Sequence, residues 1–343
     1  MNAHAAMDID TEATLAELAT SIRESRGVAH KRDIDAVMRT LGNHPMLTNT
    51  TKATNVIAVG DDCAAIPDGD GFLLFAIEGF INEFVEKEPW FAGYCGVMVN
   101  VSDIYAMGGR PIAIVDALWS RDGNAAQPIL DGLAEASRVY NVPVVGGHSN
   151  SRNDREQLSV AILGRAKKLL TSFDAKPGEH IVAAIDLRGR FHEPYAYWNA
   201  SIGSPAERLR GDLDLLPSIA EDGLSAAGKD ISMAGIVGTT LMLLECSALG
   251  ATIDVDAIPR PSGVPLQRWL TAFPSFGFLL SVADDKLDEV LARFAARDIA
   301  CASIGRTDAS HIVKLQRGAH VETVWDFNHE SLIGCGPQLV ADN

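Results

Sequence analysis

The sequence predicts a two-domain protein whose first domain is a layered α/β domain. Its 343 residues are about twice the usual size of a single domain. Short apolar runs and helical patterns alternate over residues 56–164. A polar stretch over residues 167–179, ending in Lys176-Pro177-Gly178, separates this half from a second half of similar content. We therefore expect a helical segment (1–50), a first domain (51–168) and a second domain (176–343).

The first half is expected to open with two helices, because apolar residues recur at helical spacing over residues 11–25 and 34–41. Two strands follow, with a turn-rich loop at residues 60–71 between them. A strongly apolar helix then spans residues 89–107 and ends at Gly108-Gly109. The predicted strands of this half are residues 55–59, 72–77, 112–118, 143–145 and 158–163, and a further helix covers 125–140.

The second half has a similar content of predicted helices and strands, without any short-period repeat. Its predicted strands are residues 181–185, 276–282 and 312–315, and its predicted helices are 235–249 and 287–294.

The composition indicates a globular protein and excludes several classes. Apolar residues make up 47% of the chain and charged residues 22%, which rules out a disordered, collagenous or disulfide-stapled protein. The 29 basic side chains against 45 acidic ones give a formal net charge of −16. Because no basic patch opposes this charge, we expect neither nucleic acid nor a membrane as a partner.

The cysteines and the N-terminus favour a cytoplasmic protein. The five cysteines are widely spaced and form no CxxC pair, which argues against disulfides or a zinc cluster. Asp8, Asp10 and Glu12 interrupt the N-terminus, which therefore lacks the pattern of a secretion signal. The longest apolar stretch, residues 231–253, contains Glu245 and several glycines, so we expect no membrane span.

Acidic side chains lie where they could bind a hard cation. Asp61 and Asp62 follow Gly60 at the end of a predicted strand, and Glu78 follows the next strand. Mg²⁺ prefers oxygen ligands and keeps water and substrate phosphates around it, so one or two carboxylates per ion suffice. The alternative is an ordinary acidic turn or surface acid, and for Gly60-Asp61-Asp62 alone this alternative is the commoner one.

Asn100 and Asp103 lie three residues apart in the apolar helix and therefore share one face. A charged group at a buried position needs a partner or a metal ion. The alternative is an aspartate that bonds to neighbouring backbone in a solvent-facing turn.

Two further segments could contact a phosphate. Gly146-Gly147-His148-Ser149 follows a predicted strand, and paired glycines let backbone amides approach a phosphate closely. A hairpin-like turn with an incidental histidine is the alternative. Lys229-Asp230-Ile231-Ser232 precedes a predicted helix, so Asp230 or Ser232 could cap that helix, contact a nucleotide, or do both.

The commonest nucleotide and hydrolase motifs do not occur in the sequence. Neither GxxxxGK[ST] nor GxGxxG is present, and neither is GxSxG or HExxH. What remains is a set of carboxylates at strand ends and on a buried helix. Such a set suits a metal–triphosphate, because Mg²⁺ would supply the positive potential that the acidic chain lacks.

Three segments, taken in order, resemble the AIR synthase-related superfamily. They are residues 60–66 (GDDCAAI), residues 99–111 (VNVSDIYAMGGRP) and residues 146–149 (GGHS). This superfamily includes aminoimidazole ribonucleotide synthetase, thiamine-monophosphate kinase, selenophosphate synthetase and the hydrogenase-maturation dehydratase. The similarity in motif order extends from about residue 55 into the second half, so it covers most of the chain.

The resemblance implies an N-terminal α/β domain that dimerises through its sheet into a shared β-barrel, a C-terminal α+β domain, and ATP bound with Mg²⁺ in the cleft. It implies metal ligands at Asp61, Asp62, Glu78 and Asp103. The nucleotide-site residues that we expect are Asn100, Gly146, Gly147, His148, Ser149, Lys229 and Asp230. Lys31 and Lys52 could also contact phosphate, or be ordinary surface lysines.

Two positions depart from individual branches of the superfamily. His148 stands where the kinase branch has an aspartate, as in the selenophosphate branch. Met233 replaces the metal-binding aspartate of the kinase-like ISDG motif. No cysteine precedes Cys63 to serve as the early reactive residue of the selenophosphate branch.

The sequence therefore predicts an ATP- and Mg²⁺-dependent enzyme, a homodimer, of a separate branch of this superfamily. It would phosphorylate or activate a small amide, carbonyl or phosphate-bearing metabolite. Thiamine-monophosphate kinase and a non-catalytic, nucleotide-binding regulatory dimer are the two alternatives.

Overall fold

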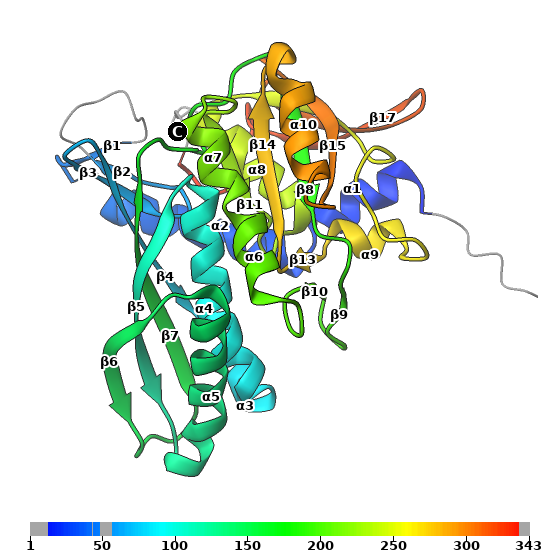
Figure 1. The fold of residues 1–343 in the computed structure, drawn as a ribbon. Coiled ribbons are helices and arrows are strands. Elements are labelled where there is room, and N and C mark those ends of the chain that lie inside the picture. The colour runs from blue at the N-terminus through cyan, green and yellow to red at the C-terminus, as the bar shows by residue number, and fades with distance from the viewer. Residues whose placement is uncertain (1–12, 43, 49–56, 336–343) are drawn as a thin grey trace, which may run out of the picture.

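A computed structural model describes residues 13–42, 44–48 and 57–335 of the protein. Within these ranges the strands form two seven-stranded sheets and one three-stranded sheet, and each large sheet is packed against helices (Figure 1). The predicted two-domain α/β architecture is confirmed. No helix in these ranges is both long enough and apolar enough to cross a membrane.

The first sheet is mixed, because its central strands are antiparallel and a parallel pair of strands lies at each end. In order across the sheet its strands are β1 (Leu47–Thr48), β2 (Ile57–Ala58), β3 (Ala64–Asp68), β4 (Gly71–Gly79), β7 (Gln157–Ala166), β5 (Arg110–Trp119) and β6 (Val144–Asn150). Helices α4 (Pro89–Ala106) and α5 (Gly123–Tyr140) pack on each other and along one face of this sheet (Figure 1).

Helix α4 is apolar over most of its surface, and it is buried for that reason. Pro89 begins it at a position where a missing N–H costs nothing. A short helix, α3 (Asn82–Lys87), joins β4 to α4.

The second sheet is covered on both faces. Its strands, in order, are β11 (Ala227–Asp230), β14 (Gly277–Val282), β8 (His180–Ile185), β15 (Ala300–Asp308), β12 (Gly250–Asp254), β16 (Ile312–Arg317) and β17 (His320–Asp326). Val182 and Ala184 of β8 join the core with α6 (Ala206–Leu213), α7 (Leu215–Glu221) and α10 (Leu287–Ala295). The alternate residues of β8, Ile181 and Ala183, join a second core with α1 (Leu15–Arg23), α8 (Gly235–Ser247) and α9 (Leu266–Leu270). This alternation follows from the two-residue period of a strand.

A small sheet and a second N-terminal helix complete the described part of the fold. The small sheet has the order β13 (Phe273–Pro274), β10 (Tyr197–Asn199), β9 (Arg190–Phe191). Helix α2 (Arg26–Leu41) follows α1 after Ser25, whose side chain accepts a hydrogen bond from the Val28 N–H and so caps the helix.

The structure corrects four local predictions. The loop predicted at residues 60–71 contains strand β3, which pairs with β4 through Ala64↔Phe75. Helix α3 was not predicted. Strand β6 does not end before Gly146 but continues to Asn150, because it pairs with β5 as far as Trp119↔Asn150. Asp230 and Ser232 do not cap helix α8: Asp230 belongs to β11, and the N-cap of α8 is Ala234 without a side-chain hydrogen bond.

Candidate functional site

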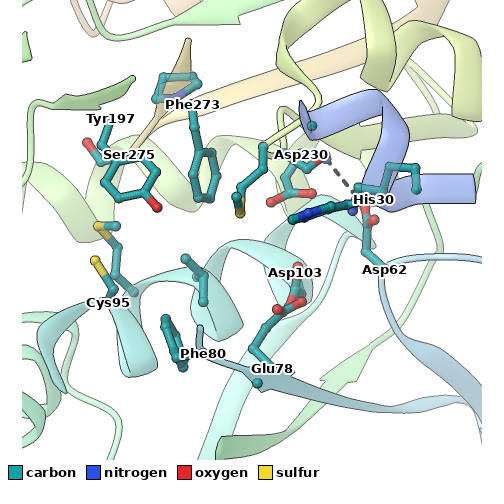
Figure 2. Close-up of a pocket in the computed structure, with 18 of the residues that line it drawn as sticks. His30, Asp62, Glu78, Phe80, Cys95, Asp103, Tyr197, Asp230, Phe273 and Ser275 are labelled. Atoms are coloured by element: carbon teal, nitrogen blue, oxygen red, sulfur yellow. Dashed lines mark hydrogen bonds between the residues drawn. The ribbon is translucent and has the colours of Figure 1, made fainter. Parts of the chain in front are cut away.

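A cavity of about 440 Å³ lies between the two domains and gathers the acidic residues singled out in the sequence. Five carboxylates line it: Asp61, Asp62, Glu78, Asp103 and Asp230. Figure 2 shows Asp62, Glu78, Asp103 and Asp230 together at one end of the cavity, with His30 of α2 beside them. Residues more than 160 positions apart in the chain therefore meet at one place.

The turn at Gly60 directs the next two aspartates into this cavity. Gly60 has φ +110°, which a residue with a Cβ rarely adopts, and a Cβ here would lie 2.5 Å from the Cys335 side chain. Asp61 accepts hydrogen bonds from both the backbone N–H and the hydroxyl of Ser172, each at 2.7 Å. Asp61 is thus already held by the segment that joins the two domains, whereas Asp62 is directed toward Lys229.

Lys229 is a buried cation beside the five carboxylates that line the cavity, which we call the acidic cluster. Its ammonium group is buried, forms an ion pair with Asp62 and lies 3.9 Å from an Asp61 oxygen. Burial alone would lower the pKa of Lys229, but the charges of Asp62 and Asp61 outweigh it and raise this pKa. Lys229 is therefore charged at neutral pH and compensates part of the negative charge.

Helix α4 presents two buried polar atoms without a partner among the described residues. The Asp103 side chain is 7% exposed, and its Oδ2 accepts no hydrogen bond there. Asn100 is fully buried; its Nδ2 donates to the Gly96 carbonyl at 2.8 Å, while its Oδ1 is unpartnered. Buried polar atoms are nearly always bonded, so an unpaired carboxylate oxygen that faces a cavity indicates a ligand. Asp103 lines the cavity, whereas Asn100 does not.

The carboxylates raise one another's pKa values. Burial, and then the nearby charges of Asp230, Glu78 and Asp62, hold the pKa of Asp103 well above its usual range. Burial, and then the charge of Asp62, raise the pKa of Asp230 to about 8 against the lowering effects of Lys229 and Lys31. Burial also raises the pKa of Asp61, to about 6, against the lowering effect of Lys229. Such a cluster is short of positive charge, which a divalent cation would supply.

The donor set fits a cation that is shared with a ligand. Within the described part of the chain, no three histidine, cysteine, aspartate or glutamate side chains lie close enough to hold a metal ion unaided. Mg²⁺ usually takes one or two protein carboxylates and completes its shell with water and substrate phosphates. The chemistry of this cavity therefore suits Mg²⁺ that arrives with a phosphate ligand.

Three further residues considered in the sequence analysis also line the cavity. Lys31 of α2 lines the cavity, and its charge opposes the rise that burial causes in the pKa values of Glu78 and Asp230. Met233 lines it too, as does Ser232, whose buried hydroxyl lacks a partner among the described residues. Lys52 lies outside the described residues.

The segment Gly146-Gly147-His148-Ser149 does not meet the acidic cluster within one chain. All four residues belong to β6, an exposed edge strand of the first sheet, and none of them lines the cavity. The expectation that they follow a strand is wrong. Gly147 has a packing reason to be glycine, because a Cβ there would collide with the Asp116 carbonyl of the neighbouring strand.

Sequence reasoning missed the part of the cavity that the small sheet contributes. Tyr197 of β10 and Phe273 of β13 line it, together with Phe80, which follows β4. No local motif marks these residues. Their proximity depends on the pairing of two short strands that are 76 positions apart, Tyr197↔Phe273.

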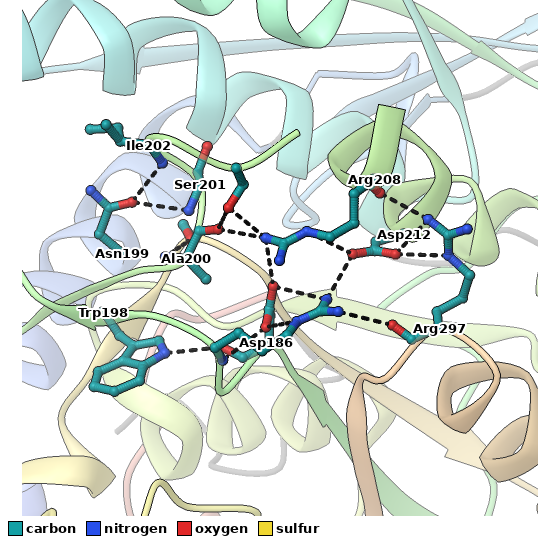
Figure 3. Close-up of polar contacts among 12 residues, drawn as sticks. Asp186, Trp198, Asn199, Ala200, Ser201, Ile202, Arg208, Asp212 and Arg297 are labelled. Atoms are coloured by element: carbon teal, nitrogen blue, oxygen red, sulfur yellow. Dashed lines mark hydrogen bonds and ion pairs between the residues drawn. The ribbon is translucent and has the colours of Figure 1, made fainter. Parts of the chain in front are cut away.

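A buried ion network holds the segment that follows β10 (Figure 3). Asp186 accepts from the Arg188 guanidinium at 2.7 Å, and Arg208 lies 3.4 Å from the other Asp186 oxygen. Asp212 accepts from Arg188 at 3.0 Å and from Arg297 at 2.8 Å. Both carboxylates are almost fully buried, so each depends on its arginines.

Replacing Asp212 with alanine is expected to lower the free energy of unfolding by about 3 kcal/mol, because breaking a buried ion network leaves its cations uncompensated. Arg208 of this network also donates to the Ala200 carbonyl at 2.9 Å, so β10 should loosen as well. The matched control is Asp214→Ala, which breaks a solvent-exposed pair with Arg110 and should cost less than about 1 kcal/mol. Urea denaturation measures both; equal losses would contradict the assigned role.

Without nucleotide, the free energy of unfolding is expected to fall as the pH rises from about 5 to about 8. Unfolded aspartates titrate near pH 4, whereas the folded pKa is about 6 for Asp61 and about 8 for Asp230. The native state therefore binds more protons than the unfolded state in this window. The stabilisation is complete below the unfolded pKa and is lost as the pH passes the folded values.

Urea denaturation in EDTA across this pH range measures the effect. Asp230→Asn should flatten the slope, because the amide has no proton to lose. A free energy of unfolding that rises with pH in the unmodified protein would contradict the electrostatic account of the cluster.

Family models match both halves of the chain. Residues 60–166 match the model of the AIR synthase related protein N-terminal domain, and residues 198–318 match that of the AIR synthase related protein C-terminal domain. An uncharacterized protein of Synechocystis sp. is 45% identical over 322 residues, which cover 93% of this chain and 98% of the relative. Thiamine-monophosphate kinase of Pyrococcus abyssi is 27% identical over 81% of this chain and 91% of its own length.

The fold is shared with a solved structure. Thermotoga maritima PurL, in a structure of its complex with ATP, superposes with a TM-score of 0.72 at 20% identity. The superposition covers 95% of this chain and 53% of PurL, so the chain spans about half the length of that protein. At this identity the likeness shows a common fold.

Proposed function

Because this chain belongs to the AIR synthase-related family, we propose that it is an ATP- and Mg²⁺-dependent enzyme that phosphorylates or activates a small metabolite. Several members of the family, thiamine-monophosphate kinase among them, are ATP-dependent enzymes. The observation that carries the proposal for this chain is the buried Asp103 carboxylate: its Oδ2 has no partner among the described residues, and Asp103 lines a cavity shared with Asp62, Glu78 and Asp230.

The residues that would hold the cation are Asp62, Glu78, Asp103 and Asp230. A bound Mg²⁺ would neutralise charge on the triphosphate and on the transferring phosphoryl group. In such a transfer the acceptor's nucleophilic atom bonds to the γ-phosphorus, while the bond to the β,γ-bridging oxygen breaks and its electron pair leaves with ADP.

The protein's own contribution would be positioning and charge. Asp61 is fixed by Ser172 and keeps the Gly60 turn in place, so that Asp62 faces the cavity. Lys229 offers a buried ammonium beside Asp62, where it can stabilise negative charge that develops on a phosphoryl oxygen. Positioning and electrostatic stabilisation account for most catalysis of phosphoryl transfer.

The test is ADP formation from MgATP against a panel of small acceptors, with thiamine monophosphate included. Acceptor-dependent ADP release with a compound other than thiamine monophosphate is the expected result. Turnover only with thiamine monophosphate would make the protein a thiamine-monophosphate kinase, in spite of His148 and Met233. Tight MgATP binding without turnover on any acceptor would instead indicate a regulatory, nucleotide-binding protein.

We also propose that the protein is a homodimer that buries the open face of the first sheet. Large apolar side chains are exposed on its strands: Phe75 and Ile77 of β4, Ile112 and Val115 of β5, and Val145 of β6. An apolar patch of this kind on a sheet usually marks an interface. Gly146–Ser149 do not line the cavity of their own chain. They could therefore contact a nucleotide only if it were bound in the cavity of the other subunit of such a dimer.

Val115→Glu is expected to convert the protein to a monomer, because it places a charge in the middle of the proposed interface, at a side chain that is 43% exposed in the single chain. Light scattering after gel filtration should give about twice the 36.6 kDa chain mass for the unmodified protein and the single-chain mass for the variant. Asp131→Glu, on an exposed face of α5, is the control and should leave the mass unchanged. A monomeric unmodified protein would refute the dimer.

A further inference from the structure

The cavity has two chemically different ends. The carboxylates and Lys229 occupy one end, and aromatic side chains occupy the other. Figure 2 shows Phe80, Tyr197 and Phe273 on the side away from Asp62 and Asp230. We call these three rings, with Phe84 and Phe91 behind them, the aromatic end. It lies within the same cavity, so one ligand can touch the aromatic end while it reaches the carboxylates.

The aromatic end is built from both domains and is rigidly packed. Tyr197 and Phe273 are register partners of two parallel strands, so their rings lie on one face of the small sheet, edge to face at 5.8 Å. Phe84 of α3 meets Tyr197 edge to face at 5.6 Å and Phe91 of α4 at 5.8 Å. The two buried rings therefore support the partly exposed ones, which are free to contact a ligand.

None of the described residues that line the aromatic end carries a positive charge; Arg26 of α2 acts on Tyr197 by its charge but does not line the cavity. Of the described residues that line the cavity, the basic ones are His30, Lys31 and Lys229. Lys229 pairs with Asp62, the charge of Lys31 acts on Glu78 and Asp230, and His30 lies beside these acids in Figure 2. All three therefore belong to the carboxylate end.

The polar groups at the aromatic end are neutral. Burial raises the pKa of the Tyr197 phenol to about 12, and it also raises the pKa of the Cys95 thiol, so both keep their protons at neutral pH. His192 stacks on Phe91 with ring centroids 4.0 Å apart, but it does not line the cavity. A phosphate or carboxylate placed here would lose its hydration without a compensating cation.

Two of the hydrogen-bond acceptors nearby are already engaged. The Asn199 side-chain oxygen accepts from the backbone N–H groups of Ser201 and Ile202, each at 3.0 Å. The Ser275 hydroxyl accepts from the Ala200 N–H at 2.9 Å. A purine base has several ring nitrogens and an amine to satisfy, so this end suits a less polar ring than that of the nucleotide.

We infer that the acceptor carries an uncharged aromatic group that binds between Phe80, Tyr197 and Phe273, with its nucleophilic atom turned toward the carboxylate end. This inference rests on the proposed function, because it names the substrate class of the same site. The inference excludes acceptors that would place a phosphate at the aromatic end. Of the amide, carbonyl and phosphate-bearing metabolites expected from the sequence, it leaves the uncharged ones.

The probes are benzamide, an uncharged aromatic amide, and benzoate, the anion with the same ring. Binding of each to the full chain is measured by ligand-observed NMR titration. Benzamide should bind saturably, and benzoate at least about tenfold more weakly, because the anion would be desolvated without a cation. Benzamide should still bind when a saturating, non-hydrolysable ATP analogue and Mg²⁺ are present.

Phe273→Leu should weaken benzamide binding by about fivefold, since it keeps apolar volume but removes the ring contact. Phe72→Leu is the control, because Phe72 is a partly buried ring of β4 that lies outside the cavity. It should leave benzamide binding unchanged. If Phe273→Leu does not fold, Phe80→Leu serves the same purpose from the segment between β4 and α3.

Three results would overturn the inference: no benzamide binding that is sensitive to Phe273 or Phe80, equal affinity for benzoate, or displacement of benzamide by the ATP analogue. The last result would assign the aromatic end to the nucleotide base. Calorimetry of MgATP on the same samples separates the two proposals. MgATP binding without benzamide binding defeats this inference alone, and absence of MgATP binding defeats the proposed function.

Discussion

Asp103→Asn is expected to abolish Mg²⁺-dependent ATP binding while it makes the nucleotide-free protein more stable. Loss of a supporting residue around a metal typically costs up to about 100-fold in affinity, so loss of a direct carboxylate ligand should cost at least as much. Stability should change in the opposite direction. Protonating Asp103 in its buried, acidic surroundings costs free energy at neutral pH, and asparagine has no such cost.

Calorimetry of MgATP binding and thermal melting in EDTA measure the two effects. The gain in melting temperature should be present at about pH 8 and absent near pH 4, where the unfolded aspartate is protonated as well. Asp131→Asn, on the exposed face of α5, is the control and should change neither quantity. Unchanged ATP affinity at saturating Mg²⁺ would remove Asp103 from the site.

Lys229→Met is expected to destabilise the nucleotide-free protein by about 3–5 kcal/mol, because removal of one partner of a buried ion pair leaves the other charge uncompensated. The methionine fills similar space, so the loss reports charge rather than a cavity. The carboxylates left without their ammonium are those of Asp62 and Asp61. Urea denaturation at about pH 7.5 in EDTA gives the free energy of unfolding.

A double variant shows where this loss comes from. Adding Asp62→Asn to Lys229→Met should recover much of the lost stability, since both members of the pair are then neutral. Lys167→Met, at an exposed position after β7, is the control for loss of a lysine and should change stability by less than about 0.5 kcal/mol. If Lys229→Met is as stable as the unmodified protein, Lys229 does not balance the cluster.

The long periodic elements were predicted from the sequence with small errors. The helix predicted at residues 89–107 is α4 (Pro89–Ala106), and that predicted at 125–140 is α5 (Gly123–Tyr140). Both have strong local signals: a proline at the start of α4, and Asp122 at the start of α5, which caps it by accepting from the Asn124 and Ala125 N–H groups.

The short elements could not be predicted, because tertiary pairing decides them. Strand β3 contains Pro67 and Asp68, residues that are rare in strands, and it forms because β4 lies beside it. From the sequence we expected strand β6 to end before Gly146-Gly147. It continues through them because β5 supplies its hydrogen-bonding partner. Helix α3 has six residues, too few for a clear helical period.

The site was predictable from the sequence only where its residues stand out locally. Carboxylates at strand ends and on a buried helix are visible in the sequence as polar residues in apolar surroundings, and they do share one cavity. The pairing of Lys229 with Asp62 spans 167 positions, and no local pattern reveals it. The aromatic end likewise depends on the register Tyr197↔Phe273, which only the folded chain defines.

The central claim is that Asp62, Glu78, Asp103 and Asp230 hold divalent cations only together with a triphosphate. Isothermal titration of ATP into the protein, in Mg²⁺ and again in EDTA, tests it most directly. We expect ATP to bind in Mg²⁺, to lose at least about 100-fold in affinity in EDTA, and Mg²⁺ alone to bind weakly, since no three described ligands enclose it. ATP affinity that is the same in Mg²⁺ and in EDTA, or no ATP binding in either, would contradict the claim.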